Sequence, residues 1–215
     1  MIAINEILKN KNKPSLELVS ETLDRDTAAL AIDKLNWPVS DYKPKAAVNI
    51  GYNETELFLK FSIEEESIRA IYTENNSRVS EDSCCELFIS PDSNDCYYNF
   101  EFSCIGTLLM GYRKMGNPAT RPSAELMDKV RRQSSLGNQP FGLTEGLHHW
   151  TLTVAIPLEA FFMHKLTCLK EKILAVNLYK CGDGLTKPHY LSLFPINTEK
   201  PSFHRPDYFG ALRFS

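Results

Sequence analysis

The sequence predicts an all-β fold, an antiparallel β-sandwich or jelly roll with one or two short helices. Three observations indicate this class. Many short segments alternate apolar and polar side chains, Pro, Gly, Asn and Asp separate these segments, and helical periodicity is rare. Short strands punctuated by turn residues are typical of a sandwich or jelly roll rather than of a parallel α/β sheet.

The chain shows no internal repeat, low-complexity tract or glycine-serine linker that would mark a boundary between domains. Residues 1–25 are polar, and we expect them to be a loosely attached lead-in. A single domain is then expected over residues 26–215. The first segment of this domain, 26–37, begins with an aspartate and is compatible with a helix or with a strand that enters the core.

The remaining segments are predicted mainly as strands. The expected strands are 46–52, 56–63, 84–90, 97–104, 107–113, 150–157, 173–181, 189–194 and 209–214. Two helices are expected: one over 123–133 with Ser123 as its N-cap, and one of one or two turns over 157–165, where Pro157 suits a first-turn position.

The segments 84–90 and 97–104 flank the turn-forming residues PDSND at 91–95, and together they predict a β-hairpin. Opposed residues of an antiparallel pair point to the same side of the sheet. The apolar residues share one side when Leu87 lies opposite Phe100, and this pairing also sets Ile89 opposite Tyr98.

This register places Glu86 directly across from Glu101, whereas a two-residue slip would make the two residues diagonal neighbours. Like charges that face each other on a sheet are unfavourable. We therefore expect a compensating group beside the pair: a cation, an arginine, a shared proton or a ligand. This expectation makes the hairpin a candidate binding site.

Composition excludes several classes of function. The formal net charge is −3 with no basic stripe, which argues against nucleic acid as a partner. No run of 18 apolar residues predicts a membrane span. The motifs GxSxG and HExxH, a P-loop and a dinucleotide fingerprint are missing from the sequence.

No signal peptide is visible, so we expect a cytoplasmic protein if the chain is full-length and a secreted or periplasmic one if a leader was removed. The oligomeric state is not predicted.

The six cysteines, at 84, 85, 96, 104, 168 and 181, match no zinc-binding spacing. We expect reduced thiols that pack as small apolar side chains. A disulfide of Cys85 with Cys104 or Cys96 is the alternative.

Four interpretations of Glu86 and Glu101 are compatible with the residues alone. The two carboxylates could be solvated on a surface, or could accept hydrogen bonds from sugar hydroxyls together with Tyr97, Asn99 and Ser103. They could also serve a glycosidase, which needs a carboxyl separation of about 5–5.5 Å for retention or about 6.5–9.5 Å for inversion. A calcium ion is the fourth possibility.

The segment PSFHRPDYFG at 201–210 precedes the last strand and is proline-rich. It is either a rigid loop with a solvated Arg205 or a ligand-facing loop, because loops on a rigid sandwich often carry binding sites. Phe203 and His204 lie in the same loop. Phe203 is either a plug in the core or an exposed platform.

Five stretches of the chain resemble successive strands of the family 9 carbohydrate-binding modules, and most closely the branch that occurs as stand-alone proteins. They are VSEDSCCELFISPD (79–92), YYNFEF (97–102), WTLTVAIP (150–157), ILAVNLYKCGDG (173–184) and FHRPDYFGALRF (203–214). The resemblance spans roughly residues 30–215. It implies a sandwich of the DOMON-like kind that binds sugar without cleaving it.

The resemblance also implies roles for individual residues. Modules of this family hold a terminal glucose or xylose unit between two aromatic side chains, and polar groups contact its hydroxyls. Glu86 matches the family carboxylate, and Phe203 matches the aromatic residue before the final strand. The other aromatic position falls on Ser80. Glu101 and Ser103 stand where the modules use basic and amide side chains.

We therefore predict non-catalytic binding of a xylan- or glucan-type oligosaccharide or terminal sugar, in polysaccharide catabolism. The predicted binding residues are Glu86, Glu101, Tyr97, Asn99, Ser103, Phe203, His204 and Arg205. Arg205 would donate to the ligand or neutralise the glutamate pair, and Trp37, Tyr72 or Tyr112 could replace the second aromatic. No catalytic residue, metal or cofactor is predicted, with calcium as an option. The alternatives are a glycoside hydrolase that uses Glu86 and Glu101, and a protein-interaction sandwich that has lost sugar binding.

Overall fold

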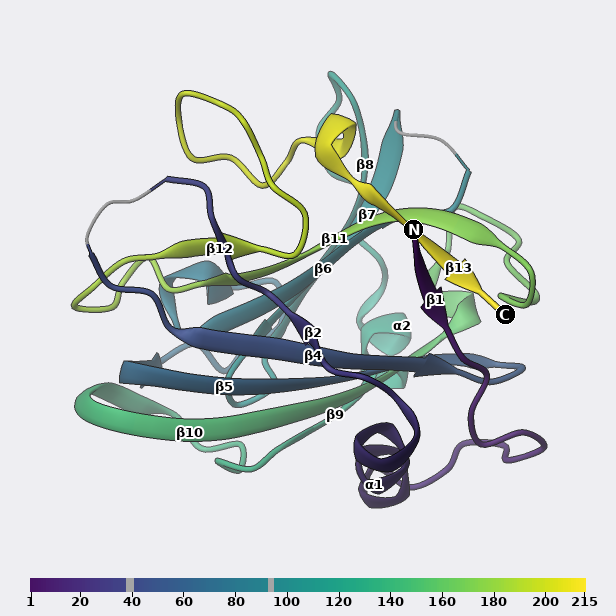
Figure 1. Ribbon diagram of the computed structural model, residues 1–215, viewed down its shortest axis with the longest axis horizontal. Coiled ribbons are helices and arrows are strands. Elements are labelled where there is room, and N and C mark those ends of the chain that lie inside the picture. Colours follow the sequence, from purple (N-terminus) through teal and green to yellow (C-terminus); the bar gives the residue numbers. More distant parts are fainter. Residues whose placement is uncertain (38–40, 93–94) are drawn as a thin grey trace.

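The computed structural model describes residues 1–37, 41–92 and 95–215 of the protein. Two β-sheets lie face to face, and two α-helices lie beside them (Figure 1). The predicted all-β sandwich is confirmed. None of the helices in the described part of the chain combines the length and apolar character needed to cross a membrane.

The larger sheet has the strand order β1-β13-β11-β6-β7-β8, and β12 and β3 extend it beside β11. All neighbours are antiparallel except β1 and β13, which are parallel. The strands are β1 (Ile2–Ile4), β3 (Lys34–Leu35), β6 (Cys84–Ser90), β7 (Cys96–Ser103), β8 (Leu108–Lys114), β11 (Ile173–Cys181), β12 (Tyr190–Ser192) and β13 (Gly210–Phe214).

The smaller sheet has the antiparallel order β2-β4-β5-β10-β9. Its strands are β2 (Leu30–Ala31), β4 (Lys45–Tyr52), β5 (Glu56–Ala70), β9 (Arg131–Ser134) and β10 (Phe141–Pro157). Strands β5 and β10 are longer than predicted. The added part of β10, residues 141–149, is mostly exposed, and its apolar residues Leu143 and Leu147 do not face the core.

The register predicted for the β6–β7 hairpin is confirmed. Leu87 pairs with Phe100, and Glu86 pairs with Glu101. The tip of the predicted turn, residues 93–94, lies outside the described residues. Leu87 and Phe100 belong to the main core between the sheets, so the burial of one face of the hairpin fixes which residues its other face presents.

The first 25 residues differ from the expected loose lead-in. Strand β1 pairs with β13 in the larger sheet. Helix α1 (Leu16–Asp26) packs the buried Val19 and Leu23 against Phe58 of the smaller sheet. These two residues are one helical turn apart and therefore share a face, a short apolar pattern that the polar composition of the segment conceals.

The helical predictions are confirmed in part. Residues 26–37 contain the short strands β2 and β3, in agreement with the strand alternative. Helix α2 (Ala124–Lys129) begins after Ser123, whose hydroxyl accepts a hydrogen bond from the backbone N–H of Leu126. It ends earlier than predicted, because the chain enters β9. The segment after Pro157 forms a single 3₁₀ turn, η2 (Leu158–Ala160).

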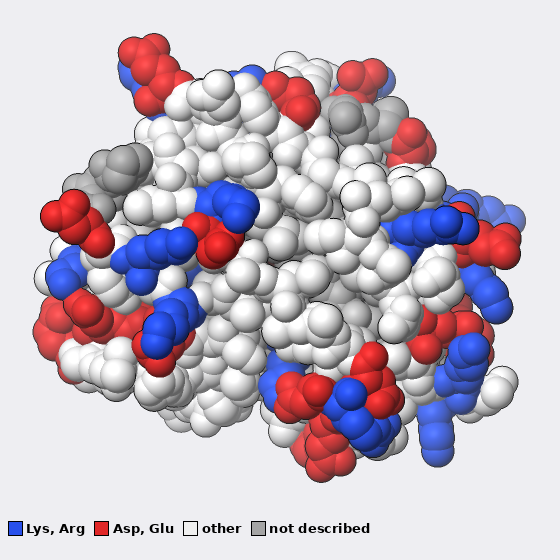
Figure 2. All heavy atoms as spheres, in the orientation of Figure 1, with Lys and Arg blue, Asp and Glu red and all other residues white. Residues whose placement is uncertain are grey.

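On the face shown in Figure 2, basic and acidic side chains lie beside one another around the margin of a large uncharged area. This mixture of signs agrees with the small formal net charge of −3.

Candidate functional site

The candidate site lies on the face of the larger sheet that points away from the smaller sheet. Alternate residues of a strand face opposite sides, so the neighbours of core residues such as Leu87 point outward. Phe88 of β6 belongs to an outer aromatic cluster, and Cys84 and Cys181 pack together near it. Residues 201–204, which we call the covering segment, close over this face before β13 (Figure 1).

A cavity of about 150 Å³ lies between the sheet and the covering segment. Its lining residues are Ser80, Glu86, Phe88, Glu101, Cys181, Asp183, Tyr190, Pro201, Ser202, Phe203 and His204. Four of the predicted residues are among them: Glu86, Glu101, Phe203 and His204. The structure therefore brings the facing glutamates together with the aromatic residue of the loop.

The two glutamates form the floor of the cavity and are not solvated surface groups. Glu86 is 3% exposed and Glu101 is 7% exposed. The Cys181 thiol lies 3.1 Å from Oε1 of Glu86 and donates to it. The Asn99 side-chain amide donates to Oε1 of Glu101 at 2.8 Å.

Burial raises the pKa of Glu86 well above its usual value, and the neighbouring Cys181 and Glu101 raise it further. Burial also raises the pKa of Glu101, but the Asn99 hydrogen bond and the charges of Arg113 and Arg121 act in the opposite direction. The charges of Arg113 and Arg121 near Glu101 are among the compensating groups expected beside the facing pair.

Phe203 is held by other aromatic side chains. Its ring stacks on Tyr179, with ring centroids 4.1 Å apart and an angle of 10° between the planes. Trp37 lies at 6.0 Å and is tilted by 44°, and Tyr190 lies at 6.1 Å and 72°. Phe203 is half-buried and lines the cavity, so it combines the two expected roles of packed side chain and platform.

A second ring parallel to Phe203 across the cavity is not formed by the candidates named from the sequence. Trp37 contacts Phe203 directly. The Tyr72 hydroxyl donates to Glu81 at 2.6 Å, and Tyr112 packs on Tyr98. Ser80 does line the cavity at the position where the resemblance placed the missing aromatic.

Three other predicted residues lie behind the cavity lining. Tyr97 is buried, and its hydroxyl is 2.9 Å from Nδ1 of His204. Asn99 supports Glu101 as described above. Ser103 is buried at the end of β7, where its hydroxyl accepts from the backbone N–H of Thr107 at 3.1 Å. Their side chains share the outward face with Glu101, as predicted, but they are covered.

Arg205 is not among the residues that line the cavity. Its guanidinium pairs with Asp207, with Nη2 and Oδ2 2.6 Å apart, and lies 4.9 Å above the ring of Tyr208. The arginines that act on Glu101 are instead Arg113 and Arg121. An acidic residue two positions after Arg205 was the available signal for this local pair.

The sequence reasoning missed Asp183 and Tyr190, which complete one wall of the cavity. Asp183 is hydrogen-bonded to Ser80 and Tyr190, and its pKa is raised, mainly by burial. The backbone N–H of Asp183 donates to the Ser80 carbonyl at 2.8 Å. This bond ties the turn after β11 to the 3₁₀ turn η1 (Val79–Glu81).

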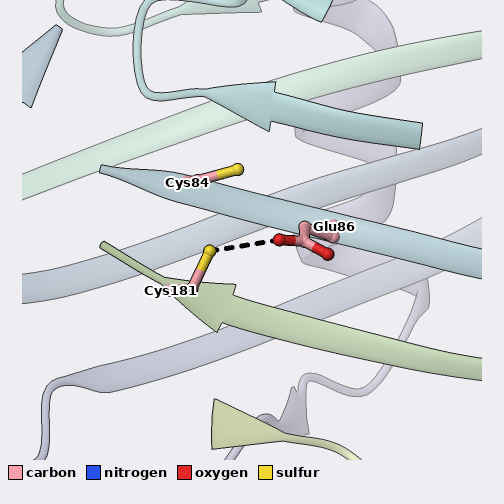
Figure 3. Close-up of side chains that lie close together, drawn as sticks. All are labelled: Cys84, Glu86 and Cys181. Atoms are coloured by element: carbon pink, nitrogen blue, oxygen red, sulfur yellow. Dashed lines mark hydrogen bonds between the residues drawn. The ribbon is translucent and has the colours of Figure 1, made fainter. Parts of the chain in front are cut away.

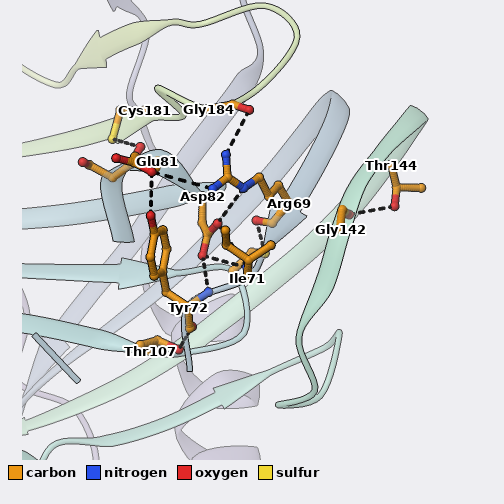
Figure 4. Close-up of polar contacts among 12 residues, drawn as sticks. Arg69, Ile71, Tyr72, Glu81, Asp82, Thr107, Gly142, Thr144, Cys181 and Gly184 are labelled. Atoms are coloured by element: carbon orange, nitrogen blue, oxygen red, sulfur yellow. Dashed lines mark hydrogen bonds and ion pairs between the residues drawn. The ribbon is translucent and has the colours of Figure 1, made fainter. Parts of the chain in front are cut away.

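A polar network fixes these two turns to the sandwich (Figure 4). The Arg69 guanidinium on β5 contacts Asp82 at 3.3 Å and Glu81 at 3.7 Å, and donates to the carbonyl of Gly184 at 3.4 Å. Asp82 is fully buried and accepts from the backbone N–H of Ile71. The network therefore holds the wall that contains Ser80 and Asp183 in place.

Comparisons with known proteins agree with this geometry. The sequence model of carbohydrate-binding family 9 matches residues 17–214. The chain belongs to this family. The match confirms the resemblance seen in the sequence, and it begins earlier, so that it includes helix α1. No match was found among curated proteins.

Two solved proteins are similar to this family 9 chain. A protein from Bacteroides uniformis ATCC 8492, provisionally described as carbohydrate-binding, is 37% identical, with a TM-score of 0.94 over 100% of this chain and 99% of that one. A family 9 module from Caldicellulosiruptor kristjanssonii is 8% identical in both of its complexes. Its glucose complex gives a TM-score of 0.60 and covers 100% of this chain and 95% of the module. Its cellotriose complex gives a TM-score of 0.59 and covers 99% of this chain and 92% of the module. This second likeness shows the shared fold alone.

Proposed function

We propose that this family 9 protein binds carbohydrate without cleaving it, and that the cavity above Glu86 and Glu101 receives one terminal sugar unit. The observation that carries the proposal is the meeting of fixed polar groups and an aromatic ring in one cavity. A pyranose ring has an apolar C–H face and a polar edge of hydroxyls. Phe203 suits the apolar face, and the glutamates suit the hydroxyls.

The size of the cavity supports a single sugar unit. Its volume of about 150 Å³ is below the range of roughly 300–1,000 Å³ found for pockets that enclose drug-sized ligands. One ring of an oligosaccharide would lie inside, and the rest of the chain would leave through the opening. Xylo- and cello-oligosaccharides are the first ligands to test, because the related module was solved with glucose and with cellotriose. Binding of this kind would serve polysaccharide catabolism.

The hydrogen-bonding groups at the floor of the cavity would determine which sugars the site binds. The carboxyl oxygens of Glu86 and Glu101 accept hydrogen bonds from two hydroxyls of the sugar. Both side chains are nearly excluded from water, so a ligand that lacks the matching hydroxyl would leave a buried polar group unpaired, at a cost of about 1–3 kcal/mol.

The test compares wild-type protein with the Glu86→Gln variant by calorimetry against xylo- and cello-oligosaccharides. We expect roughly 5- to 150-fold weaker binding in the variant, which corresponds to the cost given above. Glu21→Gln, an exposed substitution on α1, is the matched control and should bind like the wild type. Thermal melting of each variant verifies that it is folded.

Three outcomes would contradict the proposal in different ways. Unchanged affinity in Glu86→Gln would remove this residue from the site. Failure of the folded wild type to bind any sugar on a glycan array would favour the protein-interaction alternative. Release of reducing sugar by the wild type, lost in both Glu86→Gln and Glu101→Gln, would favour the glycoside hydrolase.

A further inference from the structure

Two thiols and one carboxyl group lie close together on strands β6 and β11 (Figure 3). Cys84 on β6 and Cys181 on β11 are direct cross-strand partners, and Glu86 follows Cys84 by two positions on the same face of the sheet. The Cys181 sulfur lies 3.1 Å from Oε1 of Glu86. One ligand atom of each residue lies within 4.8 Å of the other two.

We propose that Cys84, Cys181 and Glu86 bind a divalent metal ion of the zinc class. Zinc prefers thiolate, imidazole and carboxylate ligands, with bonds of about 2.3 Å to sulfur and about 2.0–2.2 Å to oxygen. Two ligands of one ion are therefore separated by at most the sum of their two bonds, which is about 4.6 Å for a pair of sulfurs. The three ligand atoms lie within 4.8 Å of one another, and the one sulfur–oxygen distance of 3.1 Å is well inside the limit, so the three side chains are spaced as ligands of a single ion require.

The cavity supplies the route to the cluster. Cys84 is fully buried and Cys181 is 1% exposed, yet Cys181 and Glu86 both line the cavity. An ion that enters the cavity meets these two ligands first and Cys84 behind them. The carboxyl groups of Glu101 and Asp183 line the same space along the route. The fourth coordination position faces the cavity and is filled by water or by an oxygen of a bound molecule.

The binding reaction is a replacement of protons by the ion. The two thiols each lose their proton, any proton on the carboxyl group is also released, and the three anionic groups then coordinate the ion. No electrons are transferred. The site requires both sulfurs in their reduced state, which the structure shows.

The test uses the protein of residues 1–215, reduced and freed of metal, and titrates it with Co²⁺ under anaerobic conditions. Cobalt is the probe because its thiolate complexes absorb in the near ultraviolet. We expect one equivalent of Co²⁺ to produce a thiolate charge-transfer band, which Zn²⁺ then abolishes by displacement. The band should be lost in Cys84→Ser and in Cys181→Ser.

Two control variants separate this site from other thiols. Cys168→Ser removes the exposed cysteine and should leave the band unchanged. Cys96→Ser tests the other group of potential ligands found in the described residues, Asp92, Cys96 and His164, and should also leave the band unchanged. A band lost only in Cys96→Ser would place the ion at that second group and would overturn the proposal.

A second measurement avoids the risk that a serine variant fails to fold. Wild-type protein is alkylated slowly with iodoacetamide, with and without Zn²⁺, and the modified cysteines are identified by mass spectrometry. We expect Zn²⁺ to slow the modification of Cys84 and Cys181 and to leave Cys168 unaffected. Absence of both the cobalt band and this selective protection would overturn the proposal, whatever the outcome of the sugar-binding measurements.

Discussion

Replacement of Lys180 by methionine should destabilise the protein by about 3–5 kcal/mol, because it leaves a buried glutamate without its cation. The Lys180 ammonium lies 2.8 Å from Oε2 of Glu65, and both side chains are 0% exposed. Glu65 also accepts from the Trp150 indole N–H at 2.7 Å. Lys180 donates to the carbonyl of Cys181 at 2.8 Å and contacts His189 at 3.0 Å. This polar group joins the two sheets inside the core.

The expected loss can be measured by urea unfolding and by thermal melting. A change of 1 kcal/mol shifts the melting temperature of a protein of this length by about 2–4 °C, so the substitution should lower it by roughly 6–20 °C. The urea midpoint should fall without a change in the slope of the transition, since the surface exposed on unfolding stays nearly the same.

The matched control is Lys187→Met on the surface. The Lys187 ammonium lies 2.6 Å from Glu66, but the two side chains are 48% and 53% exposed. Exposed pairs contribute about 0–1 kcal/mol, so this control should change stability little. The double variant Lys180→Met/Glu65→Gln should recover part of the loss, because the uncompensated charge is removed. Equal effects of Lys180→Met and Lys187→Met would refute the reasoning.

Two further predictions concern the walls of the cavity. Burial and the charges of Arg113 and Arg121 lower the pKa of His204 from 6.5 to about 4, so the unfolded chain binds a proton in this range that the folded protein does not. Stability should therefore fall as the pH decreases from 6.5 to 4, and His204→Phe should flatten this part of a profile of urea midpoints; an unaltered slope would contradict the assignment. Gly184→Ala should weaken sugar binding and lower the melting temperature, because the added Cβ would lie 2.5 Å from the Glu81 carbonyl oxygen and would overlap the Arg69 guanidinium. Gly142→Ala, where the Cβ meets open space, is the control, and equal effects of the two alanines would contradict this prediction.

The floor of the cavity could be predicted from the sequence because strand alternation and burial determine it. Leu87 and Phe100 must both face the core, so Glu86 and Glu101 must share the outer face, and the pairing of Leu87 with Phe100 sets the two glutamates directly opposite each other. The position of Phe203 could not be obtained in this way. It depended on the family resemblance, since a loop before a strand has no periodicity that shows which side of the sheet it covers.

The wall formed by Asp183 and Tyr190 could not be predicted for a different reason. Asp183 lies in a turn that bonds to Ser80, more than a hundred positions away in the chain. No local pattern indicates such a contact.

Arg205 shows the opposite case. A local signal was present, because Asp207 lies two positions away. The two residues form a short-range ion pair in preference to a long-range contact of Arg205 with the glutamates. In residues 1–25, the mostly polar composition concealed the few apolar residues that pack α1 against the smaller sheet.

Strand β11 shows how the core and the cavity depend on the same register. Lys180 points into the core toward Glu65, whereas its neighbours Tyr179 and Cys181 point outward, toward Phe203 and Glu86 respectively. A shift of one residue against β6 would turn the ammonium into the cavity and the Cys181 thiol into the core. A one-residue shift would therefore remove the buried ion pair together with the stacked ring and the floor of the cavity. The pair and the cavity are two consequences of one strand alignment, because successive residues of a strand alternate between its faces.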